Sequence, residues 1–103
     1  MGRRAVRYEA DCELWLWPGE KAAWHFVTLP PETAAGVRAL VGGRTRGWGS
    51  VRVEATIGKT SWRTSIFPDS KSGSFLLPVK AQVRVREGVA AGDRVRLAVE
   101  ILL

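Results

Sequence analysis

The sequence has few of the residues that build catalytic or metal sites. Its 103 residues include one cysteine and one histidine. Cys12 cannot form an internal disulfide, which favours a reducing compartment, and no second thiol or imidazole stands at metal-ligand spacing from His25. Ser65 lies in no Gly-x-Ser-x-Gly elbow and has no clear histidine partner. We therefore expect no catalytic residue, no metal and no cofactor.

Long apolar runs are missing as well. No segment approaches the roughly 18 apolar residues of a membrane helix, and the N-terminus lacks an apolar signal region. The composition, 46% hydrophobic and 25% charged, is typical of a soluble globular protein. These features predict a single cytoplasmic domain over residues 1–103, with residues 1–5 as a flexible N-terminus and no membrane partner.

The charge has an excess of one sign but no concentrated tract. Sixteen Lys and Arg residues face 10 Asp and Glu residues, giving a net charge of +6. Such a balance favours association with anions. The basic residues are nevertheless spread among acidic ones, a pattern more typical of a solvated surface than of a nucleic-acid footprint.

Alternating apolar and polar residues predict a mainly β fold. Strands are expected at about residues 6–17, 22–29, 51–57, 60–67 and 94–103. The first strand should direct Cys12 and Leu14 into the core. The second is apolar on both faces, so we expect it to be covered on both sides, with a helix on the outer wall. By composition, residues 68–74 are expected to be a flexible loop.

One helix is predicted directly and a second segment is ambiguous. Pro30 and Pro31 suit a first helical turn, and Gly42 suits the end of a helix at Val41. Gly36 within this helix costs about 1 kcal/mol relative to alanine, so tertiary packing must stabilise the helix. Residues 79–87 alternate as a strand would, yet they also fit a helix, and the pattern alone does not decide.

A resemblance extends these expectations. Several short motifs occur in a recognisable order: Trp24, Leu29-Pro30, Trp48-Gly49, Trp62-Arg63-Thr64-Ser65-Ile66-Phe67-Pro68, Leu77-Pro78-Val79-Lys80, Val83-Arg84 and Gly92-Asp93. Over about residues 5–101 the chain resembles a bacterial family described as domain of unknown function nineteen hundred and five. The resemblance implies a small double-split β-barrel of about six strands capped by two short helices, so residues 79–87 should be helical. It implies no established activity.

The C-terminal part also resembles the half-motif of AbrB-type swapped-hairpin transcription factors. Those regulators build their barrel from two short chains, whereas this chain is long enough to close one alone. The resemblance keeps DNA binding as an alternative function.

The candidate ligand- or anion-binding residues combine aromatic and basic side chains. They are Trp62, Arg63, Ser65, Lys80 and Arg84, with Trp24 and Trp48 as further aromatic candidates. Lys80 and Arg84 would be like charges one helical turn apart, an unfavourable pair unless an acid or an anion lies between them.

A simpler structural interpretation stands beside each of these candidates. Glu54, Glu87 or Asp93 could neutralise the two cations, and Trp62 could belong to the core. His25 is expected to be partly buried, with its ring satisfied by a backbone group.

Four classes of function remain open. The favoured one is a non-catalytic barrel that binds a small molecule or an anion, as a monomer or a weak homodimer. The alternatives are a nucleic-acid-binding module and a protein-interaction domain, and an enzyme ranks last. A pocket holding both Trp62 and Arg84 would favour the first, whereas a continuous basic face of Arg44, Arg46, Arg52 and Arg63 would favour the second.

Overall fold

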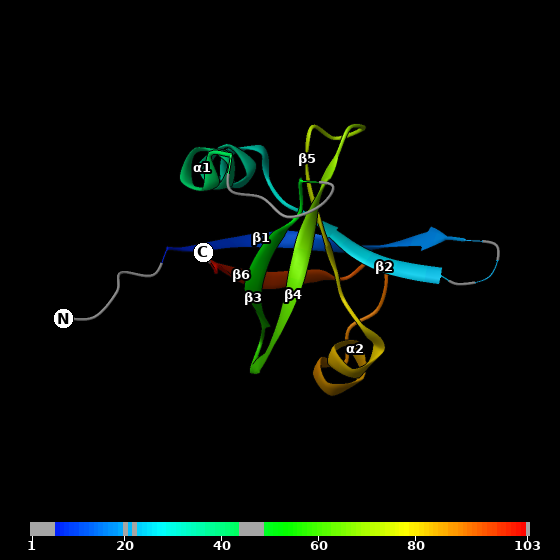
Figure 1. Ribbon diagram of the computed structural model, residues 1–103. Helices are drawn as coiled ribbons and strands as arrows, with labels where there is room; N and C mark the ends of the chain where they lie inside the picture. Colours follow the sequence, from blue (N-terminus) through cyan, green and yellow to red (C-terminus); the bar gives the residue numbers. More distant parts are fainter. Residues whose placement is uncertain (1–5, 20, 22, 44–48, 103) are drawn as a thin grey trace.

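The strands close into a small antiparallel barrel. The computed structural model describes residues 6–19, 21, 23–43 and 49–102. Along this part of the chain the elements are β1 (Arg7–Pro18), β2 (Ala23–Thr28), α1 (Pro31–Val41), β3 (Val51–Ile57), β4 (Thr60–Asp69), β5 (Ser74–Pro78), α2 (Ala81–Glu87) and β6 (Arg94–Ile101). The strands follow the order β1-β2-β5-β4-β3-β6 around the barrel (Figure 1). The predicted mainly β barrel with two short helices is confirmed.

Two long strands each serve both halves of the barrel. β1 pairs with β6 over Arg7–Glu13 and then with β2 over Leu14–Pro18. β4 pairs with β3 as far as Ile66 and then with β5 over Phe67–Asp69. Each long strand therefore passes from one sheet into the other, which is the double-split arrangement that the resemblance implied.

Alternate side chains fill the interior. The core includes Cys12, Leu14, Val27, Val53, Ile66, Leu77, Leu97 and Val99, all at most 5% exposed. Cys12 and Leu14 point inward, as their spacing predicted. Because successive residues of a strand face opposite sides, the same register directs Trp15 and Trp17 outward.

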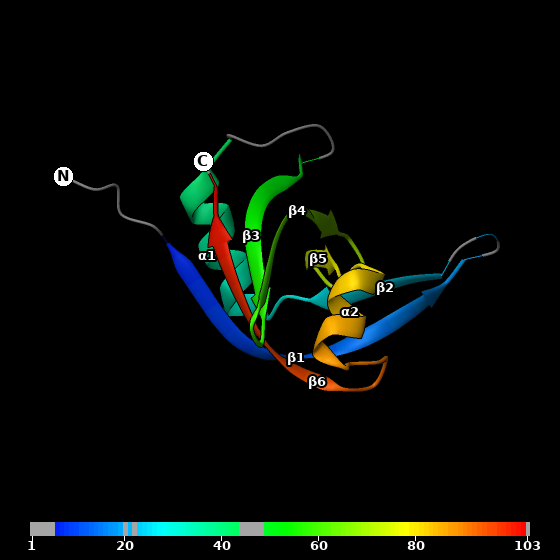
Figure 2. The same ribbon diagram turned by 90° about the horizontal axis from the view of Figure 1, so that it is seen from below.

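Among the described residues, nothing covers the Trp24 side of the start of β2, and the prediction of cover on both sides was wrong there. The end of β1 and the start of β2 extend from the barrel as a two-stranded arm (Figures 1 and 2). β2 pairs with β5 only from Phe26 to Thr28, so its first residues have a neighbouring strand on one side alone. Trp24 is consequently 51% exposed. In β2, apolar residues on both faces therefore indicate one buried face and one aromatic face that is open to solvent.

The predicted flexible loop at residues 68–74 is a tight turn, residues 70–73, between the end of β4 and the start of β5. β4 continues to Asp69 and β5 begins at Ser74, which leaves a short turn between them. The Asp69 carboxylate accepts hydrogen bonds from the backbone N–H and the hydroxyl of Ser72, at 3.1 and 2.8 Å. Ser, Asp and Gly in this stretch therefore build a hydrogen-bonded hairpin turn, which composition alone does not distinguish from a loose loop.

The two helices lie on opposite sides of the barrel (Figures 1 and 2). α1 begins with Pro31 and buries Thr33, Ala34, Val37 and Val41. A Cβ atom at Gly36 would lie 2.8 Å from the hydroxyl oxygen of Tyr8 and 2.9 Å from its ring. The glycine that weakens α1 locally therefore admits a tyrosine of β1, and this contact helps to hold the helix on the barrel.

This contact predicts that Gly36→Ala destabilises the protein. Alanine adds about 1 kcal/mol of helix propensity, but its methyl group displaces the Tyr8 ring. We expect a net loss of about 1–2 kcal/mol in the free energy of unfolding, measured by urea denaturation. In a Tyr8→Ala background the same substitution should become stabilising, since its obstacle is gone. A stabilising Gly36→Ala in the wild-type background would contradict this packing role.

Candidate functional site

A concave site opens where β5 leads into α2. This hollow of about 340 Å³, the cationic pocket, is lined by β2, β4, the end of β5 and the first turns of α2. Its wall includes Trp24, His25, Trp62, Arg63, Lys80 and Arg84. Four of the five predicted binding residues thus share one pocket, together with the aromatic candidate Trp24. The arrangement meets the criterion that favoured a small-ligand site.

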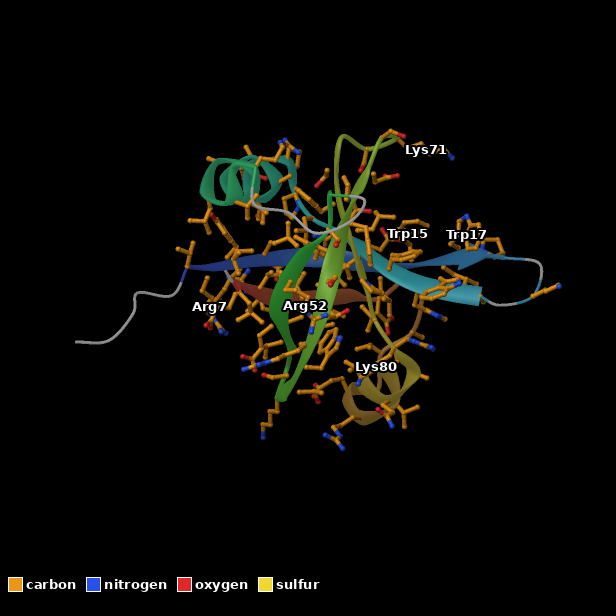
Figure 3. The ribbon with its side chains drawn as sticks, viewed as in Figure 1. Arg7, Trp15, Trp17, Arg52, Lys71 and Lys80 are labelled. Atoms are coloured by element: carbon orange, nitrogen blue, oxygen red, sulfur yellow. The ribbon has the colours of Figure 1, made fainter. Side chains whose placement is uncertain are left out.

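Local backbone geometry brings the basic residues of α2 to this place. After Pro78 the chain leaves β5, and the Val79 N–H donates to the His25 carbonyl at 2.9 Å. Lys80 is the N-cap of α2, and its carbonyl accepts from the N–H groups of Val83 and Arg84. Val83 is the buried residue of α2, so its side of the helix faces the core. Lys80 and Arg84, one turn apart, consequently face the same hollow, and Figure 3 shows Lys80 beside the start of α2.

The Arg84 guanidinium is positioned by the backbone. Its Nε donates to the Val79 carbonyl at 3.2 Å, and the side chain is partly buried. This bond leaves the terminal N–H groups of the guanidinium without a protein acceptor among the described residues. Lys80 and Arg63 are exposed. The site therefore combines one oriented cation with two that can adjust.

None of the three acids expected to neutralise these cations forms an ion pair with them. Glu87 accepts from the Lys59 N–H at 3.2 Å and from the Thr60 hydroxyl. Asp93 accepts from the Ala90 N–H at 2.8 Å. Glu54 is the strand neighbour of Arg63 without forming an ion pair with it.

The ion pairs of the described chain all lie elsewhere, between Arg7 and Glu9, Arg96 and Glu9, and Arg96 and Asp11. Neutralisation by an internal acid is therefore not found in this part of the molecule. Within the described residues, the cationic pocket carries its positive charge without a carboxylate partner.

Glu87 instead attaches α2 to the β3–β4 hairpin. Gly58 in the hairpin turn has φ +60°, and its missing side chain admits the Glu87 carboxylate, which would clash with any Cβ atom. Thr60, whose hydroxyl donates to Glu87, is buried. The acid expected to neutralise Lys80 and Arg84 thus holds the helix that presents them.

His25 is partly buried on the pocket wall, as expected, but its ring is not satisfied by the backbone. Nδ1 is buried and has no hydrogen-bond partner in the described structure. Burial of the ring and the neighbouring Arg84 guanidinium lower the pKa of His25. The expected backbone partner was wrong because the His25 carbonyl, and not its ring, accepts the bond from Val79. The neutral ring leaves a polar atom unpaired beside the pocket.

Ser65, Trp62 and Trp48 are three further candidates from the sequence. The Ser65 hydroxyl accepts from an Arg52 terminal nitrogen at 3.2 Å, between neighbouring strands and outside the pocket. Trp62 is only 8% exposed, so it is a core residue that also lines the hollow. Trp48, like Arg44 and Arg46, lies outside the described residues.

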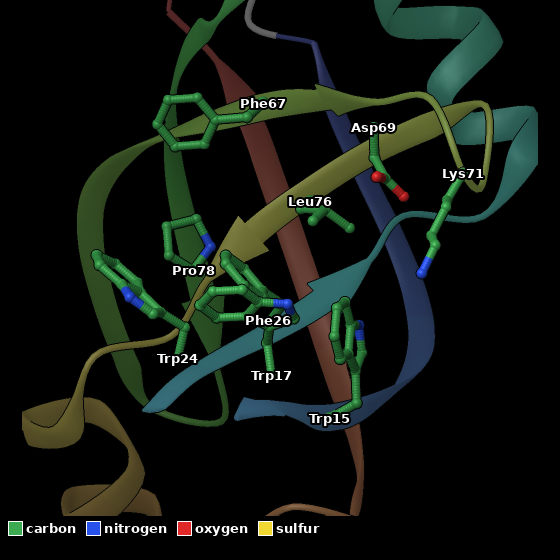
Figure 4. A pocket seen from close by; sticks show the side chains of 9 residues that line it. All are labelled: Trp15, Trp17, Trp24, Phe26, Phe67, Asp69, Lys71, Leu76 and Pro78. Carbon is green, nitrogen blue, oxygen red and sulfur yellow. The ribbon is translucent and has the colours of Figure 1, made fainter. Parts of the chain in front are cut away.

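A second hollow adjoins the first and was not predicted. This aromatic groove of about 550 Å³ is lined by Trp15, Trp17, Trp24, Phe26, Phe67, Asp69, Lys71, Leu76 and Pro78 (Figure 4). Trp17 faces Trp24 across the arm, and Trp15 faces Phe26. The Trp24 and Phe26 rings stack with centroids 6.1 Å apart and planes 8° apart. The available sequence signal was the pair of tryptophans on the otherwise polar side of β1, next to a strand apolar on both faces.

The described residues hold neither a candidate metal cluster nor a candidate membrane helix. The described residues contain no group of three His, Cys, Asp or Glu side chains that could hold a metal. In the same part of the chain no helix is both long and apolar enough to cross a membrane. The pocket supplies positive charge, aromatic surface and one neutral imidazole.

Comparison with known proteins identifies a family and no activity. The family model described as domain of unknown function (DUF1905) matches residues 11–99. These residues extend from β1 into β6 and include every wall residue of the cationic pocket. No curated protein matches the chain.

Removing the carboxylate of Glu87 should loosen α2. In Glu87→Ala the buried Thr60 hydroxyl and the Lys59 N–H lose their acceptor, and we expect the free energy of unfolding to fall by about 1–3 kcal/mol. Hydrogen exchange of the α2 amides should accelerate. Glu13→Ala, which removes an exposed carboxylate from β1, is the matched control and should stay within about 0.5 kcal/mol of wild type. Equal losses in both variants would show that Glu87 does not anchor the helix.

The environment of His25 makes stability depend on pH in a defined direction. The folded pKa of His25 is lowered, whereas the unfolded chain titrates near about 6.5, so the unfolded state binds the proton first as the pH falls. The contribution of His25 to stability should therefore be complete above about pH 6.5 and decrease as the pH falls toward the folded pKa. Burial of the ring is the larger cause of the lowered pKa, and the nearby Arg84 guanidinium acts in the same direction because it disfavours an imidazolium.

Urea unfolding of wild type and His25→Gln at a series of pH values checks this expectation. The difference in free energy of unfolding, wild type minus variant, should decrease as the solution is acidified. A difference independent of pH would contradict it.

Proposed function

This chain belongs to the DUF1905 family, and from the geometry of its cationic pocket we propose that it binds a small anionic ligand without transforming it. The observation that carries the proposal is the convergence of Arg63, Lys80 and Arg84 on one hollow, with no carboxylate partner among the described residues. Like charges held together repel, and a bound anion would remove this repulsion.

The orientation of Arg84 supports the same function. A guanidinium held through Nε presents its terminal N–H groups as a fork, which matches the two oxygens of a carboxylate or phosphate. Lys80 and Arg63, being exposed, can close on the anion from either side without a large desolvation cost. The volume of about 340 Å³ lies within the range of small-molecule sites.

The alternative of nucleic-acid binding has weaker support. Of the four arginines that would form a continuous basic face, Arg44 and Arg46 lie outside the described residues. Arg52 donates to Ser65, and Arg63 lines the pocket. The cations of the pocket wall gather in a hollow, whereas contact with a nucleic-acid backbone calls for a stripe along a surface.

Isothermal titration with inorganic pyrophosphate tests the proposal. We expect saturable binding that Arg84→Gln weakens about tenfold to a hundredfold, since a charge-assisted hydrogen bond contributes roughly 1.5–3 kcal/mol. Lys80→Gln should weaken binding less, because its flexible side chain makes a point-charge contact.

Arg86→Gln is the matched control for this titration. It removes the same charge from the same helix, but Arg86 does not line the cationic pocket. Equal losses in Arg84→Gln and Arg86→Gln would mean that net charge alone attracts the anion. Strong, steeply salt-dependent binding of short duplex DNA, with none of pyrophosphate, would favour the nucleic-acid alternative.

A further inference from the structure

The outer face of one sheet is apolar across four strands. Trp17 on β1, Trp24 on β2 and Phe67 on β4 are 49%, 51% and 41% exposed, and Leu76 of β5 lies among them in the aromatic groove (Figure 4). Large aromatic side chains gathered at this exposure are uncommon on a surface that faces only water. No helix residue of the described chain lines the groove.

The aromatic groove and the cationic pocket meet. Trp24 and Pro78 line both hollows, so the two hollows adjoin at these residues. In Figure 4 the Trp24 end of the groove lies nearest α2, whereas Asp69 and Lys71 lie at the opposite end. One ligand can therefore occupy the groove while its charged end reaches Arg63, Lys80 and Arg84.

We propose that the ligand is an anionic amphiphile, with its carboxylate or phosphate in the cationic pocket and its apolar body along the aromatic groove. This inference rests on the proposed function, because it assigns the same three cations to the head group. It adds the class of the molecule and its orientation.

The polar groups of the groove favour an apolar body. The Trp15 indole N–H already donates to the Thr28 hydroxyl at 2.9 Å. One oxygen of the Asp69 carboxylate, Oδ2, accepts two hydrogen bonds from Ser72. A nucleobase or sugar would bring donors and acceptors that find few partners here, whereas a hydrocarbon body loses nothing by leaving water.

The distribution of charge defines the orientation. At the far end of the groove Lys71 lies near the Asp69 carboxylate, so the two charges offset each other. At the α2 end three cations have no carboxylate partner in the described chain. Figure 3 shows Lys71 and Lys80 on opposite sides of Trp15 and Trp17. Of the two ends, as the described residues form them, the α2 end is therefore the one that stabilises a negative head group.

A series of straight-chain carboxylates tests the inference, with acetate, octanoate and dodecanoate titrated below their micellar concentrations. Binding is followed by calorimetry and by fluorescence of Trp15, Trp17 and Trp24. We expect affinity to rise about two- to fourfold for each methylene that enters the groove. Dodecanol, which has the same body without the charge, should bind at least about tenfold more weakly than dodecanoate.

Two groups of variants separate the head-group site from the groove. Trp17→Ala and Phe67→Ala, on different strands, should each weaken dodecanoate binding about tenfold and leave pyrophosphate binding unchanged, which also reports that they are folded. Arg84→Gln should weaken the binding of both ligands. Leu16→Ala is the matched control, because Leu16 is exposed on the same arm but does not line the groove.

The outcomes distinguish this inference from the proposed function. Suppose that pyrophosphate binding depends on Arg84 but carboxylate affinity does not change with chain length. This result would contradict the proposal of an amphiphilic ligand and still support the anion site. Loss of Arg84 dependence for every ligand would overturn both. The inference would also be wrong if dodecanol bound as tightly as dodecanoate. It would be wrong as well if the protein formed a dimer that Trp17→Ala dissociates and dodecanoate does not, because a second copy would then cover the groove.

Discussion

The structure depends on the closure of the barrel through β1 and β4. Each of these strands pairs with one sheet along its first part and with the other along its last part. Closure pairs the backbone on both sides of most strands and leaves few free edges. Because side chains alternate, a register that buries Leu14 also turns Trp15 and Trp17 outward, where Trp15 is half-buried and Trp17 exposed. A slip by one residue would place the tryptophans in the core, so packing inside the barrel determines the aromatic surface outside it.

The cationic pocket lies where the pairing between β2 and β5 ends. The first residues of β2, on the arm, are not paired with β5. The chain leaves β5 at Pro78 and then begins α2. The bond from Val79 to His25 and the contact of Glu87 with the β3–β4 hairpin attach this helix at both ends. Anchoring of this kind keeps Lys80 and Arg84 close together despite their repulsion. Exposure to water keeps that repulsion small, so a pocket can hold unpaired cations at modest cost to stability.

The candidate site could be predicted only in part. Trp62, Arg63, Lys80 and Arg84 were identified from residue type and spacing, and the structure gathers them with Trp24 in one pocket. The partners of Glu87 and the unpaired Nδ1 of His25 could not be found in this way. Each depends on a contact between elements distant along the chain, and an alternating pattern carries no information about which strand will lie opposite.

The sequence by itself determined five of the six strands, the inward side of β1, and α1 with its proline start and glycine end, because these follow from local periodicity and backbone preference. β5 was not among the strands that the pattern predicted. The family resemblance, rather than the pattern, distinguished α2 from a strand. Only the tertiary structure decided that Asp69 closes a tight turn and that β2 has an uncovered face. It also brought Phe67 of β4 alongside the tryptophans of β1. Those features arise from register and barrel closure, which are set by the packing of the whole core.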